Sequence, residues 1–218
     1  MFFTIRDVYG GGSSMYKLRT EYTAEENSAI VDIDVLGSFM DNHDNARFLS
    51  IYQGNITGFK NAVCFALTAR GIPFFYYGDE QAFSGGNDPA NRESLWNAMD
   101  SGSDMYKFVA TINKARQAAQ GWAHDYVERY VLDDLFAYSF GEMLVVTTNH
   151  DRYIELTLPY LPYEPGKEVC NAFDANDCAT VTDQGLYVTL KSLPKIYLPK
   201  DSSYFISAQT VIPQIETI

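Results

Sequence analysis

The segment Leu36–Asp44, LGSFMDNHD, constrains the fold and function of this chain more than any other. Leu36, Phe39 and Met40 can lie in a protein core, whereas the last four residues, DNHD, cannot all be buried without polar partners. A strand that ends in a carboxylate and an imidazole is typical of a site on a parallel α/β scaffold, where ligands bind at the carboxyl ends of the strands. The simpler alternative is a strand followed by a polar turn. Composition alone favours that alternative, because Asn and Asp are common turn residues.

The residues that follow predict a strand–helix–strand unit. Residues Thr57–Arg70 carry apolar side chains at helical spacing, and Gly71 stands where a helix commonly ends. Ile72–Tyr77 is a nearly continuous apolar run, which is typical of a strand buried on both faces. Because a helix connects the two strands, we expect a βαβ unit with the strands as parallel neighbours.

Three motifs at fixed spacing resolve the choice between a turn and a site. FMDNHDNARF is followed by GIPFFYYGDE from Gly71 and then by GGNDPANRE within the loop that ends near Trp96. Together they resemble the α-amylase family, the retaining α-glucan hydrolases built on a (β/α)8 barrel, and most closely its fungal secreted members. NHD resembles the end of barrel strand seven, GIPFFYYGDE resembles strand eight and its exit, and GGNDPANRE resembles a loop that lines the sugar cleft. The close resemblance covers Gly37–Trp96, and a looser one continues to about Pro199.

The resemblance implies roles for four residues. Asp44 matches a carboxylate that stabilises the oxocarbenium-like transition state, and His43 matches a histidine that hydrogen-bonds the sugar at the cleavage point. Asp88 and Arg92 match positions that bind glucose units further along the cleft, with an exposed ion pair of little energetic weight as the alternative. We also expect Arg47 to pair with an acidic neighbour and to orient its loop.

Two catalytic motifs of the family are not found in these 218 residues. Retaining glycosidases need a nucleophile and an acid/base, but neither the G-x-R-x-D segment nor the G-E-[VT] segment that carries them occurs here. The family's calcium-binding loop is also not found, so we expect no metal or cofactor in this chain but calcium in a full-length relative. The resemblance therefore implies a fragment that is inactive alone, the C-terminal half of such an enzyme, with about the last quarter of the barrel and the whole β domain.

The predicted fold is mixed α/β and all-β. Residues 1–122 are expected to form the last part of a (β/α)8 TIM barrel, with strands seven and eight and their helices. Residues 123–200 are expected to form an antiparallel β-sandwich, because apolar and polar residues alternate there between turn signals. The resemblance implies that this sandwich has a Greek-key topology. Residues 201–218 form a tail without a clear pattern. The strands expected in the β domain are Leu135–Phe140, Met143–Thr148, Ile154–Leu158, Cys178–Thr182, Leu186–Leu190 and Ile196–Leu198.

The first 36 residues and the cysteines allow weaker predictions. We expect a loop at the glycine run Gly10–Gly12, a helix over Met15–Tyr22 and a strand-like segment over Ile30–Ile33. Cys170 and Cys178 lie close enough in sequence to pair, whereas Cys64 falls within the predicted helix and is expected to be a buried apolar residue.

Charge and composition exclude some classes of binding partner. The net charge is −12 and no basic patch occurs, which argues against nucleic acid, and no apolar run is long enough to span a membrane. An α-glucan such as starch or glycogen is the expected substrate, and hydrolysis or glucan transfer would use the same residues. The first residues do not resemble a signal peptide, so we expect either an intracellular chain or one without its native beginning, although the family is secreted. A non-catalytic carbohydrate-binding protein and an inactive remnant are the alternatives.

A barrel has no sheet edges, whereas a strand pair separated from one exposes two. The faces that would pack on the remaining strands would be bare apolar surface. We therefore expect the isolated chain to be poorly soluble, to be partly molten in its first third, or to be completed by another chain.

Overall fold

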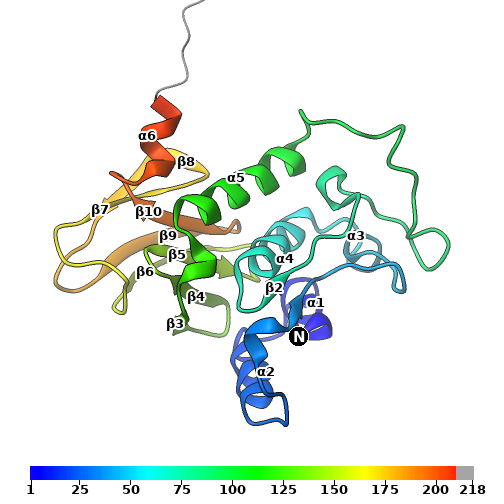
Figure 1. The fold of residues 1–218 in the computed structure, drawn as a ribbon, viewed down its shortest axis with the longest axis horizontal. Helices are drawn as coiled ribbons and strands as arrows, with labels where there is room; N and C mark the ends of the chain where they lie inside the picture. Colours follow the sequence, from blue (N-terminus) through cyan, green and yellow to red (C-terminus); the bar gives the residue numbers. More distant parts are fainter. Residues whose placement is uncertain (210–218) are drawn as a thin grey trace, which may run out of the picture.

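The computed structural model describes residues 1–209, and for residues 207–209 the backbone alone. It has a helical part, a small parallel strand pair and a larger antiparallel part (Figure 1). The helical part and the strand pair together contain, in chain order, α1 (Phe2–Tyr9), α2 (Tyr16–Glu26), η1 (Ile33–Val35), β1 (Gly37–Ser38), α3 (Phe48–Ile51), α4 (Ile56–Thr68), β2 (Ile72–Pro73), η2 (Asp79–Gln81), α5 (Asp104–Ala118) and η3 (Gly121–Ala123).

The helix α4 is the centre of this part. The Asn55 side chain caps its first turn by accepting a hydrogen bond from the Gly58 amide at 2.9 Å. Ten of its thirteen residues are buried, as expected for a helix covered on all sides. It packs against α1, α5 and the strand β5, so the predicted helix over residues 57–70 is confirmed with slightly earlier ends.

The strands β1 and β2 are parallel neighbours, with Gly37 opposite Ile72 and Ser38 opposite Pro73. The predicted βαβ order is therefore confirmed, but both strands are shorter than expected. The prediction of a strand over Ile72–Tyr77 buried on both faces is wrong, because Ile72 is 47% exposed and Phe74 is 57% exposed. Among the described residues no third strand pairs with this sheet, so both of its outer edges are unpaired.

Other parts of the N-terminal prediction need correction. Residues Ile30–Ile33 form no strand, and Val31 is fully exposed before the short helix η1. The helix predicted over residues 15–22 extends to Glu26, and α1 was not predicted at all. In the LGSFM segment Ser38 and Met40 are buried, whereas Leu36 and Phe39 are partly exposed.

The antiparallel part contains eight strands. They are β3 (Tyr126–Val131), β4 (Leu135–Phe140), β5 (Met143–Thr148), β6 (Tyr153–Leu158), β7 (Glu168–Asn171), β8 (Asp174–Thr180), β9 (Leu186–Lys191) and β10 (Lys195–Pro199). Six form one sheet in the order β3-β4-β5-β10-β7-β8, and β6 pairs with β9 in a second sheet. A core of apolar residues from both sheets lies between them. All six predicted strands are present. β4 and β5 have the predicted ends, the other four have shifted ends, and the structure adds β3 and β7.

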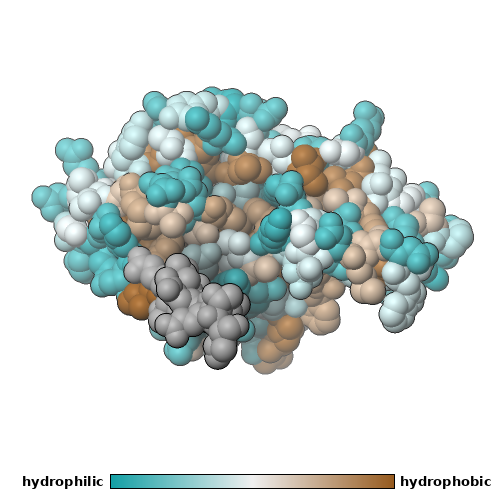
Figure 2. Space-filling view, turned by 90° about the horizontal axis from the view of Figure 1, so that it is seen from above, coloured by the Kyte–Doolittle hydropathy of each residue, from teal (hydrophilic) through white to brown (hydrophobic). Residues whose placement is uncertain are grey.

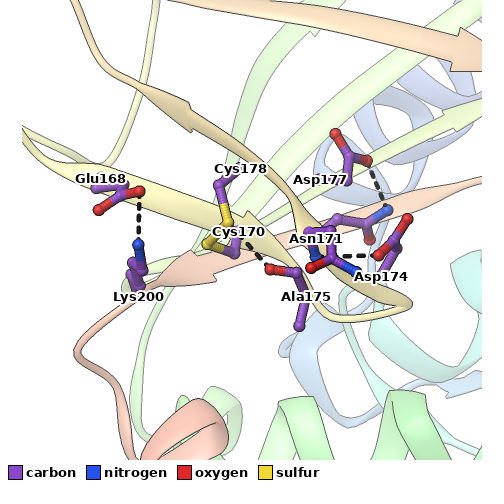
Figure 3. Close-up of a disulfide and its surroundings, with 9 residues drawn as sticks. Glu168, Cys170, Asn171, Asp174, Ala175, Asp177, Cys178 and Lys200 are labelled. Carbon is purple, nitrogen blue, oxygen red and sulfur yellow. Dashed lines mark hydrogen bonds and ion pairs between the residues drawn. A yellow bond between two sulfur atoms is a disulfide. The ribbon is translucent and has the colours of Figure 1, made fainter.

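The disulfide Cys170–Cys178 joins β7 and β8 (Figure 3). The two residues are direct partners across the antiparallel pair. Nearby, Lys200 forms an ion pair with Glu168, and the Asn171 side chain donates a hydrogen bond to Asp177 (Figure 3). The two cysteines therefore form the pair that their spacing allowed, and Cys64 is a free buried cysteine as expected.

Buried polar contacts join the helical part to the large sheet. The hydroxyl groups of Tyr9 and Thr147 are 2.7 Å apart, and those of Thr68 and Tyr138 are 2.6 Å apart. One apolar core runs from α1 and α4 through α5 to β4 and β5. The two parts therefore share a core rather than being joined by a linker alone.

The tail contains a helix that the sequence did not predict, α6 (Ser203–Gln209), and the rest of the predicted tail lies outside the described residues. Apolar residues are exposed in several places among hydrophilic ones (Figure 2). Along residues 1–209, no helix has the length and apolar character needed to cross a membrane.

Candidate functional site

The turn after β1 is built by one side chain. The Asn42 carboxamide oxygen accepts hydrogen bonds from the amides of Asp44 and Asn45, at 2.9 and 3.0 Å. A side-chain oxygen that bonds its own backbone two residues later forms a compact turn. The alternative interpretation of this segment, a strand followed by a polar turn, is therefore correct for the backbone. The same turn directs His43 and Asp44 outward, where their side chains are 65% and 70% exposed.

The four predicted site residues lie together at one end of the parallel strand pair. His43 Nε2 is 3.3 Å from Asp44 Oδ1, and Arg92 Nη2 is 3.5 Å from Asp88 Oδ2. The Arg92 guanidinium also donates to the His43 carbonyl oxygen through two nitrogens, each at 3.2 Å. The surface ion pair between Asp88 and Arg92 is therefore present, and it lies beside the histidine and the aspartate of the NHD motif.

A buried arginine holds the two loops against each other. Arg47 is fully buried and donates to Asp79 at 3.0 Å, to Glu93 at 2.7 Å and to the Tyr77 carbonyl oxygen at 3.0 Å. Glu93 in turn accepts from the Gly85 amide, at the other end of the loop. The expected pairing of Arg47 with an acidic neighbour is confirmed, and the arginine joins the loop after β1 to the loop after β2.

Asn91 adds a second connection between these loops. Its side chain is completely buried, and its amide nitrogen donates to the carbonyl oxygens of His43 and Asn45 at 2.8 and 2.9 Å. Neither Asn91 nor Glu93 was singled out in the sequence, although both belong to the GGNDPANRE motif. Buried polar side chains that bond to another loop's backbone fix its position.

Two buried carboxyl groups lie beneath the site. Asp41 is 3% exposed and accepts the Phe48 amide with both oxygens. Burial raises the pKa of Asp41 to about 6, although Arg6 acts in the opposite direction. Burial and the neighbouring Asp41 raise the pKa of Asp79 well above its usual value, against the effect of Arg47. Two buried carboxyl groups that are close enough to interact repel each other when both are ionised, so this pair holds a proton more readily than free carboxyl groups do.

Glu80 bonds only to nearby backbone and hydroxyl groups. Its carboxylate accepts from the Gly78 amide at 2.8 Å, and its carbonyl oxygen accepts from the Ser103 hydroxyl.

In residues 1–209, no three His, Cys, Asp or Glu side chains are grouped closely enough to hold a metal ion.

Comparisons with known proteins identify the family of this chain. A sequence profile of the α-amylase catalytic domain matches residues 13–140. The chain is 32% identical over 190 residues to an α-amylase from Saccharomycopsis fibuligera, which covers 83% of this chain and 38% of that enzyme. It is 37% identical over 162 residues to a β/α-amylase from Paenibacillus polymyxa, which covers 69% of this chain and 13% of that protein.

A solved structure shares the fold of this chain. The α-amylase from Malbranchea cinnamomea superimposes with a TM-score of 0.85 at 28% identity, over 92% of this chain and 44% of that one. The chain therefore belongs to the α-amylase family. It spans less than half the length of these three relatives.

Proposed function

We propose that this chain is the C-terminal part of an enzyme that hydrolyses α-1,4-linked glucans such as starch or glycogen with retention of configuration. One observation carries the proposal. The NHD turn at the carboxyl end of β1 and the loop beyond β2 meet through the hydrogen bonds from Arg92 to His43, so all four predicted residues line one edge. Ligands of parallel α/β scaffolds bind at that end of the strands.

Each residue has a role that its chemistry suits. The exposed Asp44 carboxylate provides negative charge beside the positive charge that develops on the sugar ring when the glycosidic bond breaks. His43 donates a hydrogen bond to a sugar hydroxyl at the same point. Asp88 and Arg92 form charge-assisted hydrogen bonds with hydroxyl groups of the next glucose units. Arg47 and Asn91 act on these residues through the backbone by holding the two loops together.

The nucleophile and the acid/base belong to a part of the barrel outside these residues. In the reaction the nucleophilic carboxylate forms a bond to the anomeric carbon while the acid protonates the leaving oxygen, and water then cleaves the glycosyl–enzyme ester. We accordingly propose that the chain alone is inactive. Calcium, a secreted location and a Greek-key β-sandwich for residues 123–200 are further proposals for the complete enzyme, and each rests on the family resemblance.

The test is Asp44→Asn in the complete enzyme, with Asp183→Asn in an exposed turn of the β domain as the matched control. We expect Asp44→Asn to lower kcat by about 100-fold or more, the usual effect of removing one transition-state interaction, with an unchanged melting temperature. Asp183→Asn should leave both values unchanged. Hydrolysis near the wild-type rate in Asp44→Asn would contradict the assigned role.

The products distinguish hydrolysis from transfer. Maltooligosaccharides with new reducing ends indicate hydrolysis, whereas cyclic or lengthened glucans indicate transfer. The intact mass of the protein in its source tests the premise, because a complete barrel alone needs about 250 residues. A native protein of these 218 residues would refute catalysis and leave non-catalytic glucan binding as the function to test.

A further inference from the structure

Asn55 is the acceptor residue of an N-glycosylation motif. This motif is Asn-x-Ser/Thr, where x is any residue except proline, and Asn55-Ile56-Thr57 is its one occurrence in the 218 residues. The structure places Asn55 in the connection between α3 and α4, where it is exposed. Such a motif is modified when it lies on the surface of a protein that enters the secretory pathway.

The Asn55 carboxamide can carry a sugar and still cap α4. Its oxygen accepts the hydrogen bond from the Gly58 amide at 2.9 Å. Its nitrogen, Nδ2, is the atom that receives a glycan, and within residues 1–209 it donates no hydrogen bond. Because the modification replaces one hydrogen of Nδ2 and leaves the oxygen in place, the cap of α4 is kept.

A small cavity lies beside this acceptor. It has a volume of about 220 Å³, and its wall includes Asn55 and Asn61 on one side and residues 149–151, which follow β5, on the other. The helix α4 and the strand β5 pack against each other here (Figure 1). The cavity therefore lies between the helical part and the antiparallel part of the fold.

The wall of this cavity provides polar groups that suit a sugar. Asn149 donates to the Ser13 carbonyl oxygen at 2.6 Å, but its side-chain oxygen is buried without a partner in the described part of the chain. An unpaired acceptor costs free energy until a donor is supplied. Asp151 already accepts from the Ser192 hydroxyl at 2.7 Å, and His150 is exposed. The hydroxyl and acetamido groups of a sugar both donate and accept, so they match this wall.

The disulfide Cys170–Cys178 points to the same compartment as the motif. Disulfides form and persist in the secretory pathway and outside the cell, and N-glycosylation also takes place in that pathway. The disulfide joins β7 and β8, whereas the motif precedes α4. The two features are therefore independent observations.

We propose that Asn55 carries an N-linked glycan whose first N-acetylglucosamine lies in this cavity and connects the helical part to the antiparallel part. In the transfer, Nδ2 loses a proton and forms a bond to the anomeric carbon of an oligosaccharide. The bond from that carbon to the phosphate oxygen of a lipid diphosphate carrier breaks, and the lipid diphosphate leaves with the bonding electrons. The proposal rests on the secreted location given with the proposed function.

The mass of the Asn55 peptide tests the modification. The complete enzyme is secreted from a yeast with a yeast signal sequence, so that every molecule passes the glycan-transferring enzyme. We expect a glycan on Asn55 that peptide N-glycosidase releases while converting the carboxamide to a carboxylate. Thr57→Ser keeps the motif and should keep the glycan, whereas Thr57→Ala should lack it although Asn55 remains. An unmodified Asn55 in the secreted, unchanged enzyme would overturn the proposal.

Melting temperatures test the position of the first sugar. An endoglycosidase that leaves one N-acetylglucosamine on Asn55 should not change the melting temperature. His150→Ala should lower it by about 2 °C or more in the glycosylated enzyme, but not in the Thr57→Ala background, where no sugar contacts the imidazole. An equal effect of His150→Ala in both backgrounds would refute the placement of the sugar in the cavity.

Starch hydrolysis by the same secreted samples separates this proposal from the proposed function. Neither Asn55 nor Thr57 belongs to the site around Asp44, so the glycan and the hydrolysis are read independently. A glycan on Asn55 in an enzyme that does not hydrolyse starch would overturn the proposed function alone. Hydrolysis by an enzyme with an unmodified Asn55 would overturn the present proposal alone.

Discussion

Arg47 is the residue whose replacement tests the account of the site most directly. Its side chain is fully buried, as is that of Asp79, to which it donates at 3.0 Å. Replacing Arg47 with Gln removes the positive charge and leaves the Asp79 carboxyl group buried without its main partner. The change also removes the hydrogen bonds to Glu93 and to the Tyr77 carbonyl oxygen.

The magnitude follows from this burial. Removing one partner of a buried ion pair costs about 3–5 kcal/mol, because the remaining charge is uncompensated. Arg92 provides the contrast, since its side chain is 46% exposed and its distance to Asp88 is 3.5 Å. An exposed pair contributes about 0–1 kcal/mol. We therefore expect Arg47→Gln to lower the free energy of unfolding several times more than Arg92→Gln does.

The assay is urea unfolding followed by circular dichroism at 222 nm. In the double variant Arg47→Gln/Asp79→Asn, the second change removes the unpaired charge, so it should restore at least about 1 kcal/mol, as expected for residues in contact. The loss in Arg47→Gln should also be smaller at pH 5 than at pH 8, because Asp79 can then take up a proton. A loss below about 1 kcal/mol in Arg47→Gln, or no recovery in the double variant, would refute the role given to this network.

Three further predictions concern other parts of the molecule. The pKa of Asp41 is raised to about 6, so this group favours folding below its unfolded pKa of about 4 and loses that contribution as the pH rises to about 6. Between pH 4 and pH 7, the free energy of unfolding of the unchanged chain should therefore fall by on the order of 2–3 kcal/mol relative to that of Asp41→Asn. Urea titrations at the two pH values measure this, and an equal change in both proteins would contradict it. Replacing Cys170 and Cys178 with Ser opens a loop with a sequence separation of 8, which should cost about 2–3 kcal/mol, and an unchanged melting temperature would argue against it. The isolated chain should bind a hydrophobic dye, and Phe74→Ser should bind less of it, because Phe74 is 57% exposed; dye binding that does not change would place the apolar surface elsewhere.

Local sequence patterns predicted the elements that are defined by residues close together in the sequence. The helix α4 followed from apolar spacing over one segment and a glycine at its end, and its core position needed no distant partner to be recognised. The paired cysteines belong to adjacent strands with a separation of 8, so proximity in sequence was a good guide. The strand β2 was overestimated for the opposite reason. Its apolar residues match a strand with neighbours on both sides, and in the described residues only β1 is beside it.

The candidate site was predicted residue by residue, but not the contacts that hold it. His43, Asp44, Asp88 and Arg92 followed from motifs, and the structure brings them to one edge. An acidic partner for Arg47 was expected, but the sequence could not identify it as Asp79, which lies 32 residues further along the chain. That pairing depends on the parallel alignment of β1 and β2, which only the three-dimensional fold defines.

The loops of the site and the strand pair beneath them differ in whether contacts within the chain are enough to hold them. The loops that carry His43 and Arg92 are fixed by Arg47 and Asn91, and all of those bonds lie within the chain. The strand pair is different, because the apolar side chains of Ile72 and Phe74 are 47% and 57% exposed. Hydrogen bonds between loops fix local geometry, whereas apolar faces need a partner surface. The sugar-facing edge can therefore keep its arrangement while the strand pair remains the part that depends on the rest of a barrel.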